Sequence, residues 1–104
     1  MERITLGRTG LTINRCGFGG IPIQRVDEDQ AVDTVRHAVE QGVDFIDTSR
    51  AYTTSERRIG KALKLTDKKV ILASKSVSRK AEDIRADLEK SLSELQVDHI
   101  DLYQ

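Results

Sequence analysis

The stretch Lys69-Val70-Ile71-Leu72-Ala73-Ser74-Lys75 is a mostly apolar run between two lysines. Such a run is typical of a strand that is buried on both faces of a parallel sheet. Residues 43–48 before it and residues 100–103 after it have the same apolar character. Each of them is separated from the central run by more than the dozen residues that a crossover between parallel strands requires. The spacing therefore predicts parallel strands with helices between them.

The segments between these strands carry helical patterns. Apolar residues recur on one face of residues 31–39, with Asp27 placed to cap the start of the helix and Gly42 placed to end it. We expect a second, shorter helix after Ser55 and a third after Ser78. The third has an apolar stripe with a helical period, formed by Ala81, Ile84, Leu88, Leu92 and Leu95.

The first twenty residues predict a hairpin and one more strand. Residues 3–6 and 11–14 flank Gly7-Arg8-Thr9-Gly10, a glycine-containing turn, and residues 16–19 form a short apolar segment. The chain then alternates strand and helix, which implies right-handed crossovers in a parallel sheet. Two α/β architectures fit: the N-terminal half of a (βα)8 TIM barrel, or a rearranged open flavodoxin-like sheet. Because no linker interrupts the pattern, we predict a single half-barrel domain over residues 1–104.

Composition limits the function classes. The 17 Lys and Arg residues balance the 17 Asp and Glu residues, so no net field favours nucleic acid or an anionic membrane. We see neither a signal peptide nor an apolar run of membrane-spanning length, so we expect no membrane association and a cytoplasmic location. The single cysteine, Cys16, excludes an intrachain disulfide, and we predict no metal site. We expect Cys16 to be a small, buried packing residue.

Three polar residues lie where the predicted strands end. Asp47 ends one strand, Lys75 ends the next, and Tyr52 lies five residues after Asp47. In both architectures ligands meet the carboxyl ends of the strands. A lysine cation near a phenol favours the phenolate, and such a phenol can donate a proton to a developing alkoxide. Each residue alone would more commonly be a turn, packing or strand-end residue, so the prediction of a proton-transfer site rests on their combination.

Several strings around these residues resemble the aldo-keto reductase family, in order and over essentially all 104 residues. Around the candidate site they are Asp47-Thr48-Ser49-Arg50-Ala51-Tyr52, Ser55-Glu56, Ile59-Gly60-Lys61-Ala62-Leu63 and Leu72-Ala73-Ser74-Lys75. Elsewhere they are Leu6-Gly7-Arg8-Thr9-Gly10-Leu11, Cys16-Gly17-Phe18-Gly19-Gly20, Leu88-Glu89-Lys90-Ser91-Leu92 and Asp98-His99-Ile100-Asp101-Leu102-Tyr103.

The resemblance implies a (βα)8 barrel that reduces small aldehydes and ketones with NADPH. In this family the cofactor gives a hydride to the carbonyl carbon and a tyrosine gives the proton to the oxygen. By position, Tyr52 would be that acid, Lys75 would favour its ionisation, and Asp47 would pair with Lys75. Gly20 and Ile21 would line the nicotinamide side of the NADP(H) pocket, with Asp47 near the cofactor's ribose.

The sequence departs from the family pattern in three ways. Thr53 stands where the family usually has glycine after the tyrosine, and the segment from Tyr52 to Lys75 is short. The family's catalytic histidine would fall two positions beyond Gln104. We therefore expect the 104-residue chain alone to be inactive. The alternative is a non-catalytic half-barrel fragment, or a regulatory or structural module on the same scaffold.

A half barrel also predicts association. Four barrel strands leave the first and last edges unpaired and the inner face without its opposite wall. Unpaired strand edges and exposed apolar surface favour pairing with another chain. We therefore expect this chain to self-associate.

Overall fold

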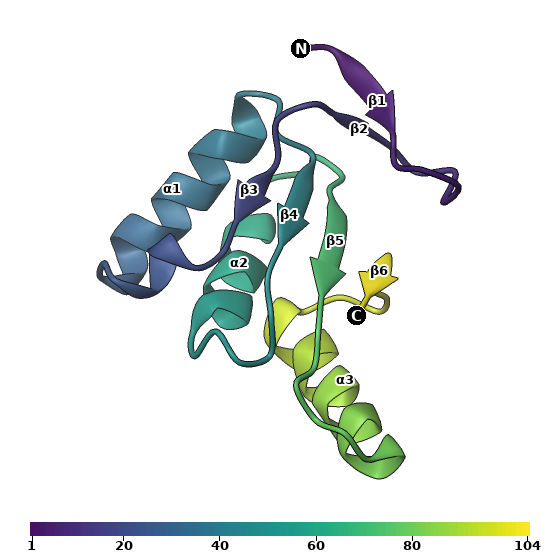
Figure 1. Ribbon diagram of the computed structural model, residues 1–104. Helices are drawn as coiled ribbons and strands as arrows, with labels where there is room; N and C mark the ends of the chain where they lie inside the picture. The colour runs from purple at the N-terminus through teal and green to yellow at the C-terminus, as the bar shows by residue number, and fades with distance from the viewer.

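A computed structural model describes residues 1–104 and contains one parallel sheet (Figure 1). The strands are β3 (Phe18–Gly19), β4 (Phe45–Asp47), β5 (Ile71–Ser74) and β6 (Leu102–Tyr103), paired in the order β3-β4-β5-β6. In a flavodoxin-like sheet the chain would instead reverse its strand order at a switch point. The consecutive parallel order is that of the predicted half barrel, so the rearranged open alternative is wrong.

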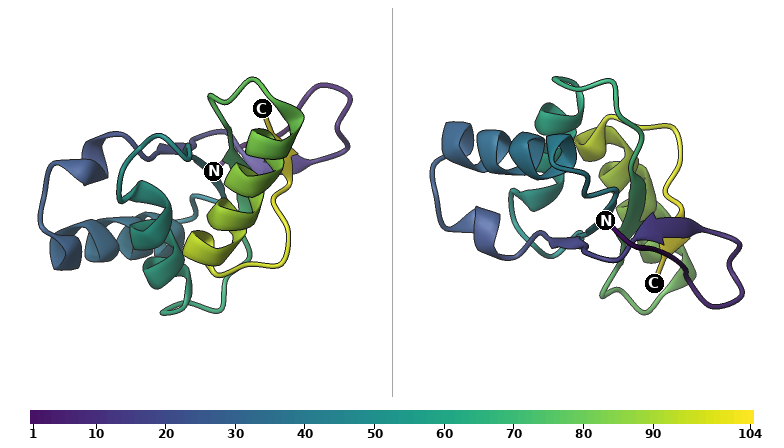
Figure 2. Two further views of the ribbon diagram at one scale, coloured as in Figure 1. Left: turned by 90° about the horizontal axis from the view of Figure 1, so that it is seen from below. Right: turned by 90° about the horizontal axis from the view of Figure 1, so that it is seen from above.

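The helices α1 (Glu28–Glu40), α2 (Ser55–Leu63) and α3 (Ala81–Leu95) follow one another around one side of the sheet (Figure 2). A short 3-10 helix, η1 (Pro22–Gln24), precedes α1. Successive strand residues point to opposite faces, so Ile46 and Leu72 enter the helix layer while Asp47 and Ala73 lie on the inner face. The core consists of Ile23, Ala31, Val35, Val39, Ile46, Ile59, Ala62, Leu72 and Leu95.

The ends of the helices agree in part with the sequence. Asp27 caps α1 as predicted, since its carboxylate accepts the N–H of Gln30 at 2.9 Å, and Gly42 follows the helix with a φ of +109°. The expected start of the third helix after Ser78 is early, because α3 begins at Ala81. The Ser78 hydroxyl instead donates to the carboxylate of Asp87 at 2.7 Å.

The predicted hairpin lies at the amino ends of the strands. It pairs β1 (Arg3–Thr5) with β2 (Thr12–Asn14) in antiparallel register. Its attachment point is Asp44, directly before β4. That carboxylate accepts the backbone N–H of Asn14 at 2.7 Å and the guanidinium of Arg3 at 2.9 Å. Ile13, in the middle of β2, is buried, whereas Thr12 before it is exposed.

Two expectations about burial are wrong. Cys16 is exposed, because it lies in the connection before β3, at an edge where no further strand covers it. The apolar stripe of α3 reaches the core only at its carboxy-terminal end: Leu95 is buried, Ile84 is partly buried and Ala81 is exposed. Figure 1 shows the first turns of α3 extending away from the sheet. No helix is both long and apolar enough to cross a membrane.

Candidate functional site

The carboxyl ends of β4 and β5 and the loop after β4 bring Asp47, Lys75 and Tyr52 together. The Lys75 ammonium donates to the two carboxylate oxygens of Asp47 at 3.2 and 3.1 Å, and to the backbone carbonyl of Thr48 at 2.7 Å. The same nitrogen lies 5.2 Å from the centre of the Tyr52 ring. This distance is that of a cation–π contact, which attracts the ammonium to the face of the ring. The residues singled out in the sequence thus form one cluster.

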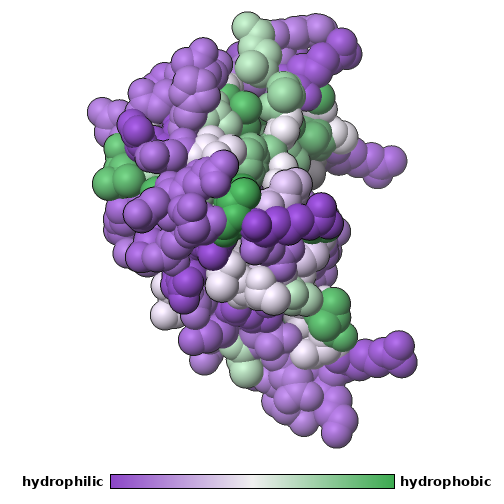
Figure 3. Space-filling view, turned by 90° about the vertical axis from the view of Figure 1, so that its left-hand side faces the viewer, coloured by the Kyte–Doolittle hydropathy of each residue, from purple (hydrophilic) through white to green (hydrophobic).

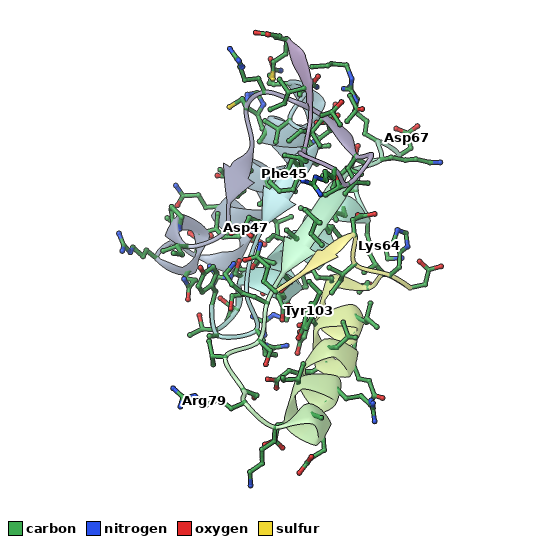
Figure 4. The ribbon with its side chains drawn as sticks, turned by 45° about the vertical axis from the view of Figure 1, so that its right-hand side comes forward. Phe45, Asp47, Lys64, Asp67, Arg79 and Tyr103 are labelled. Atoms are coloured by element: carbon green, nitrogen blue, oxygen red, sulfur yellow. The ribbon has the colours of Figure 1, made fainter.

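The cluster remains accessible to solvent. The side chain of Asp47 is 42% exposed and that of Lys75 is 26% exposed, and Tyr52 is partly buried. In Figure 4, Asp47 lies at the end of β4 and Phe45 nearer the start of the same strand. A charged pair and a phenol that are ordered but still reachable can exchange a proton with a bound molecule.

The loop after β3 lies beside this cluster. The backbone N–H of Gly20 donates to the carbonyl of Asp47 at 2.9 Å. A Cβ at position 20 would lie 2.3 Å from the Ser55 hydroxyl oxygen and 3.0 Å from that of Thr48, so the close approach requires glycine. Ile21 follows at the start of η1 with 45% of its surface exposed. Of the two predicted cofactor-lining residues, Gly20 is thus buried and bonded to Asp47, whereas Ile21 is exposed.

Thr53, at the position usually held by glycine, has a φ of +39°. This left-handed backbone is strained for a β-branched residue. The Thr53 hydroxyl donates to the side-chain oxygen of Gln24 at 2.8 Å, and the Gln24 amide donates to the carbonyl of Ile21 at 3.0 Å. The loop that carries Tyr52 therefore keeps a glycine-like path without glycine and is joined to the loop after β3.

A buried ion pair that was not predicted from the sequence lies behind the cluster. The carboxylate of Glu56, 1% exposed, lies 2.8 Å from the guanidinium of Arg50 and accepts the Ser74 hydroxyl at 2.8 Å. One signal was present in the sequence. Glu56 precedes Ile59 by three residues, and this spacing places it on the inner face of the helix.

A second polar group lies beside β6. Asp87 accepts the hydroxyls of Ser76 at 2.5 Å and Ser78 at 2.7 Å. The hydrogen bond from Ser76 is the main reason that the pKa of the Asp87 carboxyl lies below its ordinary value. Burial raises the pKa of the Tyr103 phenol, and the negative charge of Asp87 raises it further. Figure 4 shows Tyr103 on β6, close to α3.

Comparison with known proteins identifies the family. The sequence model described as "Aldo/keto reductase family" matches residues 3–104. The chain belongs to the aldo-keto reductase family. It is 38% identical to the L-galactose dehydrogenase of Arabidopsis thaliana over 98% of its own length and 37% of that protein.

Solved aldo-keto reductases also share the fold. The chain is similar to the aldo-keto reductase AKR11C1 of Bacillus halodurans, solved in its holo form, with a TM-score of 0.86 and 31% identity over 100% of this chain and 39% of that one. It is also similar to the Bombyx mori aldo-keto reductase AKR2E4 in complex with NADP, with a TM-score of 0.80 and 27% identity over 98% of this chain and 36% of that one. The chain thus spans little more than a third of the length of these relatives.

Proposed function

We propose that the site formed by Asp47, Tyr52 and Lys75 serves the NADPH-dependent reduction of small aldehydes and ketones. The observation that supports this most is the position of the Lys75 ammonium, which pairs with Asp47 and lies over the Tyr52 ring. Family membership and the carboxyl-end location agree with it, since catalytic residues of (βα)8 barrels lie at that face.

In this proposal Tyr52 is the proton donor. Its phenol gives a proton to the carbonyl oxygen while a hydride reaches the carbonyl carbon, so the product is the alcohol. The phenolate that remains is stabilised by the Lys75 ammonium and regains its proton from solvent. Asp47 pairs with the Lys75 ammonium and fixes its direction through both carboxylate oxygens. The residues of the chain thus supply the proton and hold the charge that its loss creates.

NADPH, when bound, would supply the hydride and leave as NADP⁺. The residues present fit such a group: the Asp47 carboxylate is 42% exposed, which leaves it able to accept a ribose hydroxyl. The Gly20 backbone lies beside it, and exposed Ile21 offers an apolar contact for the nicotinamide. A relative from Bombyx mori is described in complex with NADP, which supports the choice of cofactor.

The test compares turnover of the parent protein that carries this chain with that of variants. Tyr52→Phe and Lys75→Met are expected to reduce kcat by about 100-fold or more, because general-acid catalysis is worth at least that much. Lys64→Met is the matched control, since Lys64 is an exposed lysine at the end of α2 (Figure 4). Unchanged turnover in Tyr52→Phe would remove the proposed acid and favour a structural module on the same scaffold.

We also propose that the 104 residues alone do not turn over. The chain spans 37% and 39% of the length of two relatives that it matches, so most of each relative lies outside the matched region. A titration of the chain with NADPH, followed by cofactor fluorescence, should show no saturable binding and no oxidation by a reactive aldehyde. Saturable binding with turnover would refute this part.

We further propose that the chain self-associates through its sheet edges. β3 and β6 each pair on one side only. Beside β3 lies a pocket of about 310 Å³ lined by Gly17, Phe18, Gly19, Pro22, Ile23, Val26 and Thr34. Figure 3, viewed from the side of α1 and β3, shows apolar side chains among the hydrophilic ones. A second copy placing its β6 beside β3 would continue the parallel order.

Light scattering over a range of protein concentrations tests this association. The wild-type mass should rise with concentration, and Gly19→Lys should lower it, because a charged side chain on an edge strand opposes pairing. Position 19 has open space around it, so this variant should keep its fold. A compact monomer at high concentration would contradict the proposal.

A further inference from the structure

Glu56 is a buried charged residue that takes no part in the proposed proton transfer. It lies in the first turn of α2 and is 1% exposed. A carboxylate in such a position is destabilising unless its charge is paired and its oxygens accept hydrogen bonds. The charge is paired, because one oxygen lies 2.8 Å from the Arg50 guanidinium. The other oxygen accepts the Ser74 hydroxyl at 2.8 Å, whereas the oxygen that faces Arg50 makes an ion pair without a hydrogen bond.

The two partners of Glu56 lie next to the site in the chain. Arg50 is two residues before Tyr52, and Ser74 directly precedes Lys75. The backbone N–H of Arg50 also donates to the carbonyl of Lys75 at 3.0 Å. The contacts therefore close a ring that runs from the loop before Tyr52, through α2, to the strand end that carries Lys75.

The carboxylate of Glu56 makes specific contacts with two partners, which a packed apolar side chain could not make. Well-packed hydrophobic residues of similar volume commonly replace a buried ion pair without loss of stability. A carboxylate that pairs with a cation through one oxygen and accepts a hydrogen bond through the other, in contrast, links two separate segments at one point. The segments held here are the two that must meet for Lys75 to face Tyr52.

We propose that Glu56 is a positioning residue that holds the Lys75 ammonium against the Tyr52 ring by fixing Arg50 and Ser74. The inference rests on the proposed function for its significance in catalysis. The position of the Lys75 ammonium relative to the Tyr52 ring can be measured in the folded chain without cofactor or turnover.

The experiment uses NMR of the 104-residue chain with isotope-labelled lysine, the signal of Lys75 being assigned from Lys75→Met. A group above an aromatic ring is shifted by the ring current, so the ε-methylene protons of Lys75 report their distance from Tyr52. Tyr52→Leu defines the signal without the ring. Glu56→Gln, which removes the charge, is expected to lose most of the ring-induced shift while the rest of the spectrum stays dispersed.

Glu28→Gln is the matched control. Glu28 also pairs with two cations of α2, Arg57 at 2.7 Å and Lys61 at 2.6 Å, but these contacts lie on the outer side of the helix. This variant should keep the wild-type shift of Lys75. If Glu56→Gln unfolds, the double variant Arg50→Met/Glu56→Leu fills the same space without charge and is expected to fold and to lose the shift.

The outcomes separate the two proposals. If Tyr52→Leu leaves the Lys75 signal in place, the two groups do not meet in solution, and both the proposed function and the positioning role are overturned. If Tyr52→Leu moves the signal but a folded Glu56 variant retains the wild-type shift, only the positioning role is overturned. Equal loss in Glu28→Gln and Glu56→Gln would also overturn it, because the effect would then belong to α2 as a whole.

Discussion

The two ends of β4 carry the same residue type in different circumstances. Asp44 directly precedes the strand and Asp47 ends it. Asp44 binds a backbone N–H of the hairpin and the Arg3 guanidinium, and its side chain is 22% exposed. Asp47 binds the Lys75 ammonium and is 42% exposed. One carboxylate joins distant parts of the chain, whereas the other is more exposed and holds the cation that lies over the Tyr52 ring.

The different surroundings of Asp44 and Asp47 agree with a general property of (βα)8 barrels. In these barrels, residues at the amino ends of the strands contribute to stability, and residues at the carboxyl ends contribute to chemistry. At the amino end the oxygens of Asp44 are taken up by fixed protein donors. At the carboxyl end the contacts of Asp47 leave an accessible surface beside Tyr52. We therefore expect changes at the amino end to alter stability more than those at the carboxyl end.

The largest effect on stability should come from Asp44→Ala. It removes the charged acceptor for Asn14 and Arg3, and hydrogen bonds to charged groups justify a loss of about 3 kcal/mol in the free energy of unfolding. Asp47→Ala should cost less than about 1 kcal/mol, as for other partly exposed ion pairs. Urea denaturation followed by circular dichroism measures both. Equal losses would break the comparison between the two ends.

Gly20→Ala should show that the carboxyl end also contains a tightly packed point. The added methyl group would overlap the Ser55 hydroxyl and disturb its 2.8 Å hydrogen bond with Thr48. We expect a loss of about 2 kcal/mol, as for other overpacked sites. Gly19→Ala, with open space around its Cβ position, is the control and should change the unfolding free energy little. A neutral Gly20→Ala would mean that the loop moves freely.

A smaller effect is expected at the bond between Gln24 and Thr53. Gln24→Ala and Thr53→Val each remove one partner, and Thr53→Val keeps the branched shape of the side chain. A double-mutant cycle in urea should give a coupling energy of about 1 kcal/mol, typical of a neutral hydrogen bond. Strictly additive losses would show that the two loops are not joined in solution.

The smallest effect on stability should come from Asp87 and appear at acidic pH. The pKa of Asp87 is lowered in the folded chain by the hydroxyl of Ser76, so the folded state binds fewer protons there than the unfolded state. This contribution to stability is present above the unfolded value of 3.8 and is lost as the pH falls through the folded value. Asp87→Asn should flatten the acid limb of the curve of urea midpoint against pH.

Asp67→Asn removes an exposed carboxylate from the loop between α2 and β5 and serves as the control for the acid experiment (Figure 4). Its acid limb should match that of the wild type. If the urea midpoint falls equally with pH in the wild type, Asp87→Asn and Asp67→Asn, the serine contacts of Asp87 do not persist in solution.

Much of the fold could be predicted because it depends on local patterns. The run at residues 70–74 and the cap at Asp27 are encoded by neighbouring residues, and the structure contains both features. The meeting of Asp47 with Lys75 followed from topology, since parallel strands end at one edge. The catalytic roles of these residues remain predictions.

What escaped prediction depends on contacts between distant residues. The left-handed backbone of Thr53 is accompanied by a bond to Gln24, 29 positions away in the chain. The buried carboxylate of Glu56 pairs with Arg50 and accepts the hydroxyl of Ser74, which is 18 positions away in the chain. The exposure of Cys16 and of the first turns of α3 reflects which neighbours are present, and residue type alone does not encode that.

The hairpin of β1 and β2 lies at the amino ends of the strands of the parallel sheet. Asp44 joins the amino end of β4 to β1 and β2, whereas Asp47 and Lys75 at the carboxyl ends stay partly exposed. Under the proposed function, a carbonyl compound would therefore approach Lys75 from the side opposite to the hairpin.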